Sequence, residues 1–273
     1  MTTTLRPTAP EQRTDGGGRS RSYEVCVNSR PVGRIDLATD DRFGPSFGRI
    51  VRLAVDEPDR HRGRGTVAAL AAEEVLRGWG CAQITLTIPA DARTALGLAG
   101  ALGYVERARN MVKPLVTEVA LPDGSVARAM SETEFAPWHH AAKAEYVREW
   151  VEHGVPRDRA EAQAERDHAK LLPLGAATPG TLLRVLAHDG VDVGTLWLAL
   201  REEGAYIFDV EVDARYRGRG HGRTLMLLAE RESLAGGAGE LGLNVFAGNT
   251  PALRLYESLG YEPTRIHLYK VLH

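Results

Sequence analysis

Residues that could bind an anion are concentrated in one stretch of the C-terminal half, Val210 to Arg223. Glycines and arginines alternate there, just before a helical pattern that begins near Gly222. Glycine lets a ligand approach the backbone closely, and the start of a helix leaves N–H groups unpaired and carries partial positive charge. The stretch therefore predicts a phosphate- or pyrophosphate-binding loop. Its expected ligand contacts are Arg217, Gly218, Arg219, Gly220, His221, Gly222 and Arg223.

The spacing of these glycines excludes two common phosphate loops. A Walker loop would end in Gly-Lys-Ser/Thr, which is absent. A dinucleotide fingerprint would need a third glycine where Arg223 stands. The remaining pattern is Arg-x-x-Gly-x-Gly, formed by Arg217, Gly220 and Gly222. The alternative interpretation is an arginine-rich solvent loop that only begins a helix.

A second motif follows the predicted strand Leu241 to Phe246. It reads Asn-Thr-Pro-Ala-Leu-Arg-Leu-Tyr-Glu-Ser-Leu-Gly-Tyr from Asn249 to Tyr261. Asn249 suits a helix cap and Gly260 suits the residue that ends a helix. The loop and this segment together resemble the GNAT acetyltransferase superfamily, whose second segment is Asn-x-x-Ala-x-x-Leu-Tyr-x-x-x-Gly-Phe/Tyr.

The resemblance implies an α/β (α+β) fold with a mixed sheet and acetyl-CoA as cosubstrate. It further implies that the backbone of Val210 and Val212 pairs with the pantetheine arm like an added strand, beside a splayed neighbour, and that Asn249 belongs to the cofactor site. The acceptor would be an amine. We expect the C-terminal half to contain this site.

Three side chains are the catalytic candidates. Asp209 and Glu211 alternate with Phe208, Val210 and Val212, so they share one face of the strand 206–212. A carboxylate with a pKa near 4 is a poor direct base for an alkylammonium, so it would act through a water or orient the amine. Glu211 is slightly favoured because it is nearer the loop, and one of the two carboxylates could be structural. Tyr256 is the candidate acid for the thiolate; alternatively its ring packs on the sheet.

The N-terminal half repeats the same order of predicted elements. Arg62-Gly-Arg-Gly65 resembles Arg217-Gly-Arg-Gly220, an offset of 217 − 62 = 155, and Leu102-Gly-Tyr resembles Leu259-Gly-Tyr, an offset of 157. We therefore expect a tandem duplication, with domains 1–121 and 122–273. The first copy is degenerate. In this alignment Ala99 replaces Tyr256, Ala54 replaces Glu211 and Val67 replaces Gly222.

The first copy also lacks room for two helices that the second copy has, predicted from Ser131 to about His153 and from Pro156 to about Leu172. Such helices usually cover the acceptor site in this superfamily. We expect the first copy to be non-catalytic. Whether its loop binds CoA or is a scaffold turn stays open.

The composition and charge of the chain restrict the classes of partner that it is expected to bind. Residues 1–120 contain 17 Lys and Arg against 14 Asp and Glu, and the rest contain 17 against 22, for a net charge of −2. This balance argues against nucleic acid as the main partner. Cys26 and Cys81 lie in apolar strands and indicate a reducing cytoplasm. The sequence shows no membrane span, signal peptide or zinc-ligand spacing.

The sequence thus predicts a cytoplasmic N-acetyltransferase with a small-molecule or peptide amine acceptor, no metal, and an undetermined oligomeric state. A non-catalytic sensor of acyl-CoA is the main alternative. A nucleic-acid binder using both Arg-Gly-Arg loops is a distant third, and it would bind with a steep salt dependence.

Overall fold

A computed structural model of the chain describes residues 3–117 and 119–272. The chain forms two compact units, residues 1–108 with 265–273, and residues 109–264. Strands β7 (Val105–Pro114) and β13 (Glu262–Val271) each contribute residues to both units. We call residues 1–108 with 265–273 unit 1, and residues 109–264 unit 2. The predicted repeat domains, 1–121 and 122–273, stay a prediction about sequence.

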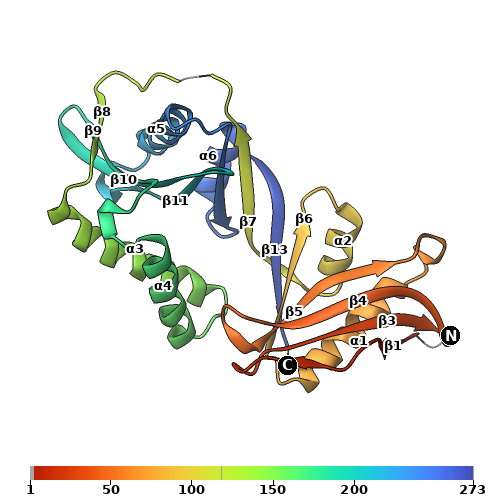
Figure 1. The fold of residues 1–273 in the computed structure, drawn as a ribbon. Coiled ribbons are helices and arrows are strands. Elements are labelled where there is room, and N and C mark those ends of the chain that lie inside the picture. The colour runs from red at the N-terminus through yellow and green to blue at the C-terminus, as the bar shows by residue number, and fades with distance from the viewer. Residues whose placement is uncertain (1–2, 118, 273) are drawn as a thin grey trace. The chain divides into compact units, whose positions relative to one another are not determined.

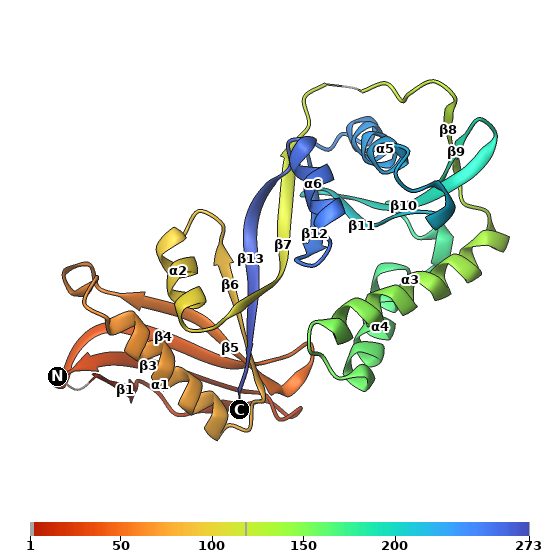
Figure 2. The same cartoon turned by 180° about the vertical axis from the view of Figure 1, so that it is seen from behind.

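Unit 1 is a mixed sheet covered by two helices (Figure 1). Its strand order is β1-β3-β4-β5-β6, followed by the part of β13 that begins at Arg265. A hairpin turn joins β3 to β4, with Asn28 and Ser29 at φ 48° and 67°. Figure 2 shows α1 running along the sheet. The element bounds are β1 Thr3–Pro7, β2 Gln12–Arg13, β3 Arg19–Val27, β4 Arg30–Asp40, β5 Gly44–Val55, α1 Arg64–Gly78, β6 Gln83–Pro89 and α2 Arg93–Ala101.

Unit 2 is a mixed sheet with helices on both faces. From the Arg109–Pro114 part of β7 its order is β7-β12-β11-β10-β9-β8. Side chains alternate along these strands: Leu196 and Leu198 pack with helix α5, whereas Trp197 packs with helix α3. The strand bounds are β8 Ser125–Ala129, β9 Thr181–His188, β10 Val191–Arg201, β11 Gly204–Val212 and β12 Glu240–Phe246; the helices are α3 Glu132–Glu152, α4 Arg157–Leu171, α5 His221–Ala235 and α6 Thr250–Ser258.

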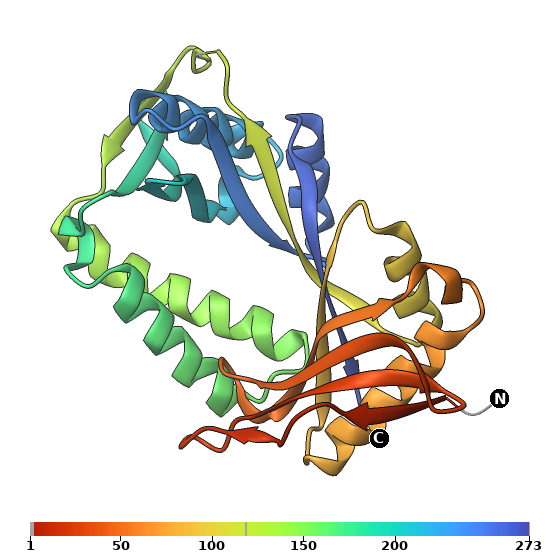
Figure 3. The same ribbon diagram turned by 45° about the vertical axis from the view of Figure 1, so that its right-hand side comes forward.

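Helices α3 and α4 are the pair predicted for the second copy. They pack side by side in Figure 3 and have no counterpart among the described residues of the first half. The predicted helix start at Ser131 is confirmed and has a capping box: the Glu134 side chain accepts the backbone N–H of Ser131 at 2.8 Å. Trp138 and Trp197 form the centre of the cluster under these helices, with rings 5.6 Å apart. The predicted α/β fold in two copies is thereby confirmed.

From the ends of β5 and β11 onward, the repeats correspond at an offset of 157 residues, which corrects part of the sequence alignment. The glycines that precede α1 and α5, Gly63 and Gly220, both have positive φ, 71° and 88°. Val67 therefore corresponds to Thr224 and not to Gly222, whose counterpart is Gly65. The 155-residue offset was wrong because the repeated Arg-Gly-Arg-Gly strings matched by letters but not by helix position. The first loop therefore keeps all three motif positions, Arg60, Gly63 and Gly65.

The ends of β7 and β13 are exchanged between the repeats. Lys113, from the N-terminal repeat, pairs with Glu230 of unit 2 at 2.7 Å. Lys270, from the C-terminal repeat, pairs with Glu73 of unit 1 at 2.7 Å. These pairs are equivalent, since 113 + 157 = 270 and 73 + 157 = 230. Each unit is therefore completed by the last strand of the other repeat.

Candidate active site

The predicted loop joins β11 to α5 and uses its glycines for two different reasons. Gly218 and Gly220 adopt φ of 76° and 88°, a left-handed backbone that favours glycine. Neither has a heavy atom within 4 Å of an added Cβ. A Cβ on Gly222 would lie 3.3 Å from Leu255 of α6. Backbone conformation and helix packing thus explain glycines that the sequence attributed only to ligand approach.

The charged side chains of the loop stay near the start of α5. The Nε of Arg217 donates to the carbonyl oxygen of Val212 at 3.0 Å, and Arg223 donates to the hydroxyl of Ser258 at 2.6 Å. The Arg219 guanidinium lies 5.8 Å from the Tyr216 ring. All three cations remain without a carboxylate partner among the described residues, so they are available as counter-charges.

His221 is the loop residue whose side chain turns inward. It is 6% exposed, and its ring lies 5.0 Å from that of His188. Burial, His188 and Arg219 lower the pKa of His221, so the imidazole is neutral at physiological pH. We therefore expect the backbone N–H of His221, as the first residue of α5, to contact the anion in place of its ring.

The strands that lead to the loop diverge. Strand β11 pairs with β12 only from Ala205 to Ile207, against Leu241 to Leu243. On its other side β11 stays paired with β10 as far as Val212. The backbone of Val210 and Val212 therefore borders an open gap on the β12 side, as the resemblance implied. Unpaired strand backbone of this kind can hydrogen-bond to an extended ligand.

A β-bulge precedes the gap and changes which side chains share a face. Trp197 pairs with Asp209 and Leu198 pairs with Ile207, so Phe208 is the extra residue. Phe208 packs against the Trp197 ring at 4.8 Å, on the face of Asp209. The predicted grouping of Phe208 with Val210 and Val212 was wrong, because alternation is interrupted at the bulge.

Three acidic groups converge at this gap. Burial first, and then the charge of Glu211, raise the pKa of Asp209 to about 7. Burial and neighbouring carboxylates raise the pKa of Glu149, on α3, to about 7. Burial, Asp209 and Glu149 raise the pKa of Tyr256, on α6, to about 12. The charge of Asp209 acts on Glu149, and both charges act on Tyr256, so β11, α3 and α6 hold the three groups within electrostatic range.

Asn249 is confirmed as a helix cap. Its side-chain oxygen accepts the N–H of Ala252 at 3.2 Å at the start of α6. The same helix carries Tyr256, whose hydroxyl has no hydrogen-bond partner in the part of the chain that the structure describes. The cap therefore fixes the helix that orients this phenol.

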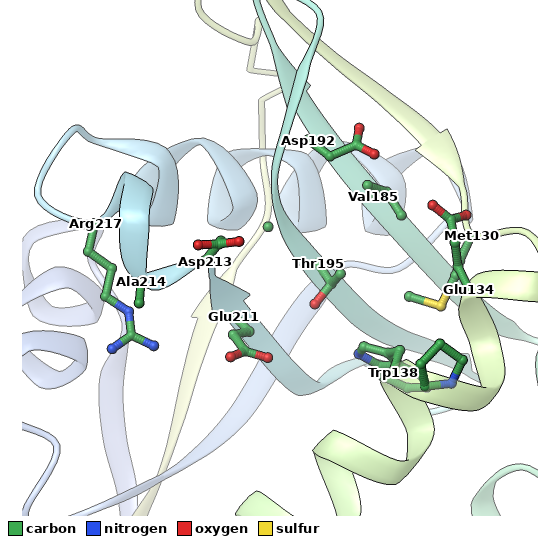
Figure 4. A pocket seen from close by; sticks show the side chains of 12 residues that line it. Met130, Glu134, Trp138, Val185, Asp192, Thr195, Glu211, Asp213, Ala214 and Arg217 are labelled. Carbon is green, nitrogen blue, oxygen red and sulfur yellow. The ribbon is translucent and has the colours of Figure 1, made fainter.

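A pocket of about 430 Å³ opens beside the end of β11 (Figure 4). Glu211 and Arg217 face it from β11 and the loop, and Thr195 and Trp138 face it from β10 and α3. The pocket wall contains four carboxylates and one arginine. Two of the four carboxylates, Glu134 and Asp192, form ion pairs with Arg128. The lining residues are Met130, Glu134, Pro137, Trp138, Val185, Asp192, Gly194, Thr195, Glu211, Asp213, Ala214 and Arg217.

This combination of splayed strands, Arg-x-x-Gly-x-Gly loop and tyrosine helix occurs in a known family. The acetyltransferase (GNAT) family matches the chain twice, over residues 3–104 and 135–261. The chain belongs to the GNAT family. It is an acyltransferase by that membership, and GNAT acetyltransferases take acetyl-CoA as cosubstrate.

Similar proteins include both single and double copies of this domain. An uncharacterised N-acetyltransferase of Bacillus subtilis, YycN, is 31% identical over 52% of this chain and 96% of its own. A mycothiol acetyltransferase of Rhodococcus erythropolis is 26% identical over 93% of this chain and 84% of its own. A GCN5-related N-acetyltransferase from Sphaerobacter thermophilus superimposes with a TM-score of 0.54 at 20% identity, covering 92% and 80% of the two chains.

Within residues 3–117 and 119–272, no three His, Cys, Asp or Glu side chains are grouped so that they could hold a metal ion. No helix in the same ranges has the length and apolar character needed to cross a membrane.

Sequence reasoning missed Glu149. The helical pattern of α3 contained a usable signal, because Glu149 follows Trp138 by 11 residues (149 − 138), which is about three helical turns. Residues so spaced lie on one face, so a buried tryptophan could have marked this glutamate as facing the sheet.

Proposed function

We propose that the chain transfers an acetyl group from acetyl-CoA to a primary amine, and that unit 2 carries the reaction. The observation that carries the proposal is the convergence of Tyr256, Asp209 and Glu149 at the gap between β11 and β12. Unit 1 has a similar loop, but Ala99 and Arg52 occupy the positions of Tyr256 and Asp209. It therefore lacks the proton-transfer groups, and we assign it a structural role.

The cofactor would lie along the open edge of β11. The backbone of Val210 and Val212 would pair with the pantetheine arm, and the start of α5 with Arg217, Arg219 and Arg223 would hold the pyrophosphate. The free N–H groups of a strand edge and of a helix start match these two parts of the ligand. Asn249 would contribute by holding α6 in place.

The acid–base roles follow from the pKa values. A carboxyl with a pKa of about 7 is a much better base at neutral pH than an ordinary carboxylate, which supports Asp209 as the proton acceptor. Glu211 lines the pocket and would orient the cationic amine. Tyr256 would donate its proton to the departing thiolate.

The pocket supports a cationic acceptor, either a small molecule or a peptide amine. Of its four carboxylates, Glu134 and Asp192 are paired with Arg128, and Asp213 is paired with Arg215. Glu211 remains to attract an ammonium group. Because some relatives are mycothiol acetyltransferases, the acetylation that those enzymes catalyse is one candidate reaction for this chain. The acceptor would enter between α3 and the end of β11.

Replacement of Tyr256 by Phe tests the proposal. We expect acetyl-CoA binding by calorimetry to persist and turnover on an amine panel to fall by about 10²-fold or more, because the general acid is lost. The matched control is Tyr23→Phe in unit 1, which should retain turnover. Acetyl-CoA binding without turnover of any amine by the parent protein would instead favour the acyl-CoA sensor.

A further inference from the structure

Helix α3 crosses one face of unit 2 and carries Glu149 to the gap. Near the start of the helix, Trp138 packs against Trp197 of β10, with ring centroids 5.6 Å apart. Near its end, Trp150 packs against Phe246 at the end of β12, at 5.4 Å. Strand β11 lies between β10 and β12. The sheet-facing side of α3 must therefore pass over the open end of β11 before it reaches β12, and Glu149 lies on that stretch.

The Glu149 carboxylate lacks a compensating partner. Within the described part of the chain its side chain makes no hydrogen bond or ion pair, and only its backbone carbonyl is used, accepting a bond from His153 at 2.7 Å. A half-buried carboxylate without a partner destabilises a fold. A purely structural role would be served better by a neutral side chain.

Asp209, on the facing strand, likewise has no ion pair among the described residues, although hydrogen bonds from the Trp138 side chain and the Val210 backbone partly lower its pKa. Its nearest charged neighbour on β11 is Glu211, another acid. The charge of Asp209 in turn raises the pKa of Glu149. Two carboxyl groups that are close enough for their charges to interact titrate as one coupled pair.

Tyr256 reaches the same place from the other face of the sheet. Helix α6 packs with the core on the α5 side, whereas α3 packs with the cluster around Trp197. Yet the charges of Asp209 and Glu149 both raise the pKa of Tyr256. The phenol therefore approaches the carboxyl pair through the gap, where an acyl group would lie.

We propose that Glu149 and Asp209 together form the proton acceptor of the acetyl transfer, sharing one proton across the gap between β11 and β12. This inference rests on the proposed function of unit 2. It assigns a catalytic role to a helix residue that the motif pattern does not contain. It also explains how a carboxylate can deprotonate an alkylammonium near neutral pH.

The acceptor ammonium gives one proton to the singly charged pair, which becomes neutral. The free amine nitrogen attacks the thioester carbon, the C–N bond forms, and the C–S bond breaks. The thiolate takes the proton of Tyr256, and the second proton of the amine nitrogen restores the phenol. The pair then releases its extra proton to solvent.

The pair is surrounded by further charged groups that set its pH range. On α3, Glu145 and Glu152 raise the pKa of Glu149, and Arg148 lowers it. Arg148 is itself paired with Glu145. On β11, Glu211 acts on Asp209, and across the gap stands neutral Tyr256. Because the acidic neighbours predominate, activity should require a pH above about 7 and should fall as the pair becomes doubly protonated.

The test compares Glu149→Gln with Glu152→Gln. Glu152 is exposed in the same last turn of α3, so its replacement removes a charge without reaching the gap. For Glu149→Gln we expect kcat to fall by about 10²-fold. The acid limb of the kcat/KM profile should move about one pH unit lower, because Asp209 loses a negative neighbour. Glu152→Gln should keep kcat within about twofold of the parent, and its acid limb should move less than that of Glu149→Gln, because Glu152 acts on the pKa of Glu149 from outside the gap. Parental kcat and an unmoved limb in Glu149→Gln would overturn the proposal.

Two further measurements separate this proposal from the proposed function and from misfolding. Acetyl-CoA calorimetry and thermal melting show whether Glu149→Gln is folded. Carbon-13 NMR titration of the carboxyl groups needs no activity: Glu149 should titrate near pH 7 in the parent and lower in Asp209→Asn. Titration of Glu149 near its ordinary pKa of about 4.3 would sink the pair even if turnover were found. A coupled pair in a protein without turnover would sink only the enzyme assignment.

Discussion

At the residue scale, the loop glycines show that a sequence pattern can locate glycine positions without giving the reason for each. Gly218 and Gly220 are required by positive φ, and Gly222 by the proximity of Leu255. The sequence identified all three positions, because a helix start after alternating glycines is a recognisable pattern. It could not separate backbone conformation from ligand approach, since both requirements select glycine.

Substitution of these glycines distinguishes the two requirements. We expect Gly220→Ala to lower the free energy of unfolding by about 1–2 kcal/mol, because an L-residue is strained at φ 88°. Gly248→Ala is the matched control: its Cβ has no heavy atom within 4 Å and its φ is not in the strained range, so stability should hold or rise slightly. Urea denaturation of both variants measures the difference. Equal midpoints would contradict the conformational explanation.

The catalytic carboxylates were only partly predictable at this scale. Period-2 alternation correctly placed Asp209 and Glu211 on one face. The bulge at Phe208 and the elevated pKa of Asp209 depend on pairing with β10 and on burial under α3, which are tertiary features. Neither the bulge nor the raised pKa can be predicted from the alternation of residues along a single strand.

At the scale of elements, the sequence located most helices and strands because their caps and periodicity are local. The Ser131 capping box and the Asn249 cap are examples. The strands against which each helix packs were harder to predict from the sequence. Glu149 was missed because the sheet strand beneath α3 is decided by the packing of Trp138 and Trp150, and the helix pattern alone does not name that strand.

The packing of α4 makes unit 2 sensitive to acid. His168 of α4 is 5% exposed, near the rings of His139 and Trp197. Burial first, and then His139 and Lys143, lower the pKa of His168 to about 4. A lowered histidine pKa means that the neutral form stabilises the fold. This contribution is complete above the unfolded-state pKa of about 6.5 and is lost as the pH falls towards 4.

We therefore expect the stability of unit 2 to decrease by up to about 3 kcal/mol between pH 6.5 and 4 through this residue. His168→Phe should flatten that part of the pH profile, whereas His140→Gln, at an exposed position of α3, should leave it unchanged. Denaturant unfolding followed by tryptophan fluorescence reports on this cluster. An unchanged pH slope in His168→Phe would refute the assignment.

At the scale of the whole molecule, the sequence predicted the duplication but not the exchange of strand ends. Repeated motifs reveal that two similar units exist. They do not reveal which repeat supplies a strand, because β7 and β13 are equivalent and either arrangement satisfies the same local pattern. The decisive contacts are long-range, Lys113 with Glu230 and Lys270 with Glu73.

This exchange predicts a crossed pattern of destabilisation. Lys113→Met removes the partner of Glu230, whose side chain is 2% exposed, and should cost about 3 kcal/mol because a buried charge is left unpaired. The loss should appear in unit 2, although Lys113 belongs to the N-terminal repeat. Lys270→Met should likewise loosen unit 1 around Glu73. Hydrogen exchange resolved by peptide measures both, with Lys170→Met on the exposed side of α4 as the control. If each variant instead loosened only the unit of its own repeat, the strand ends would not be exchanged in solution, and residues 1–121 and 122–273 would be self-contained.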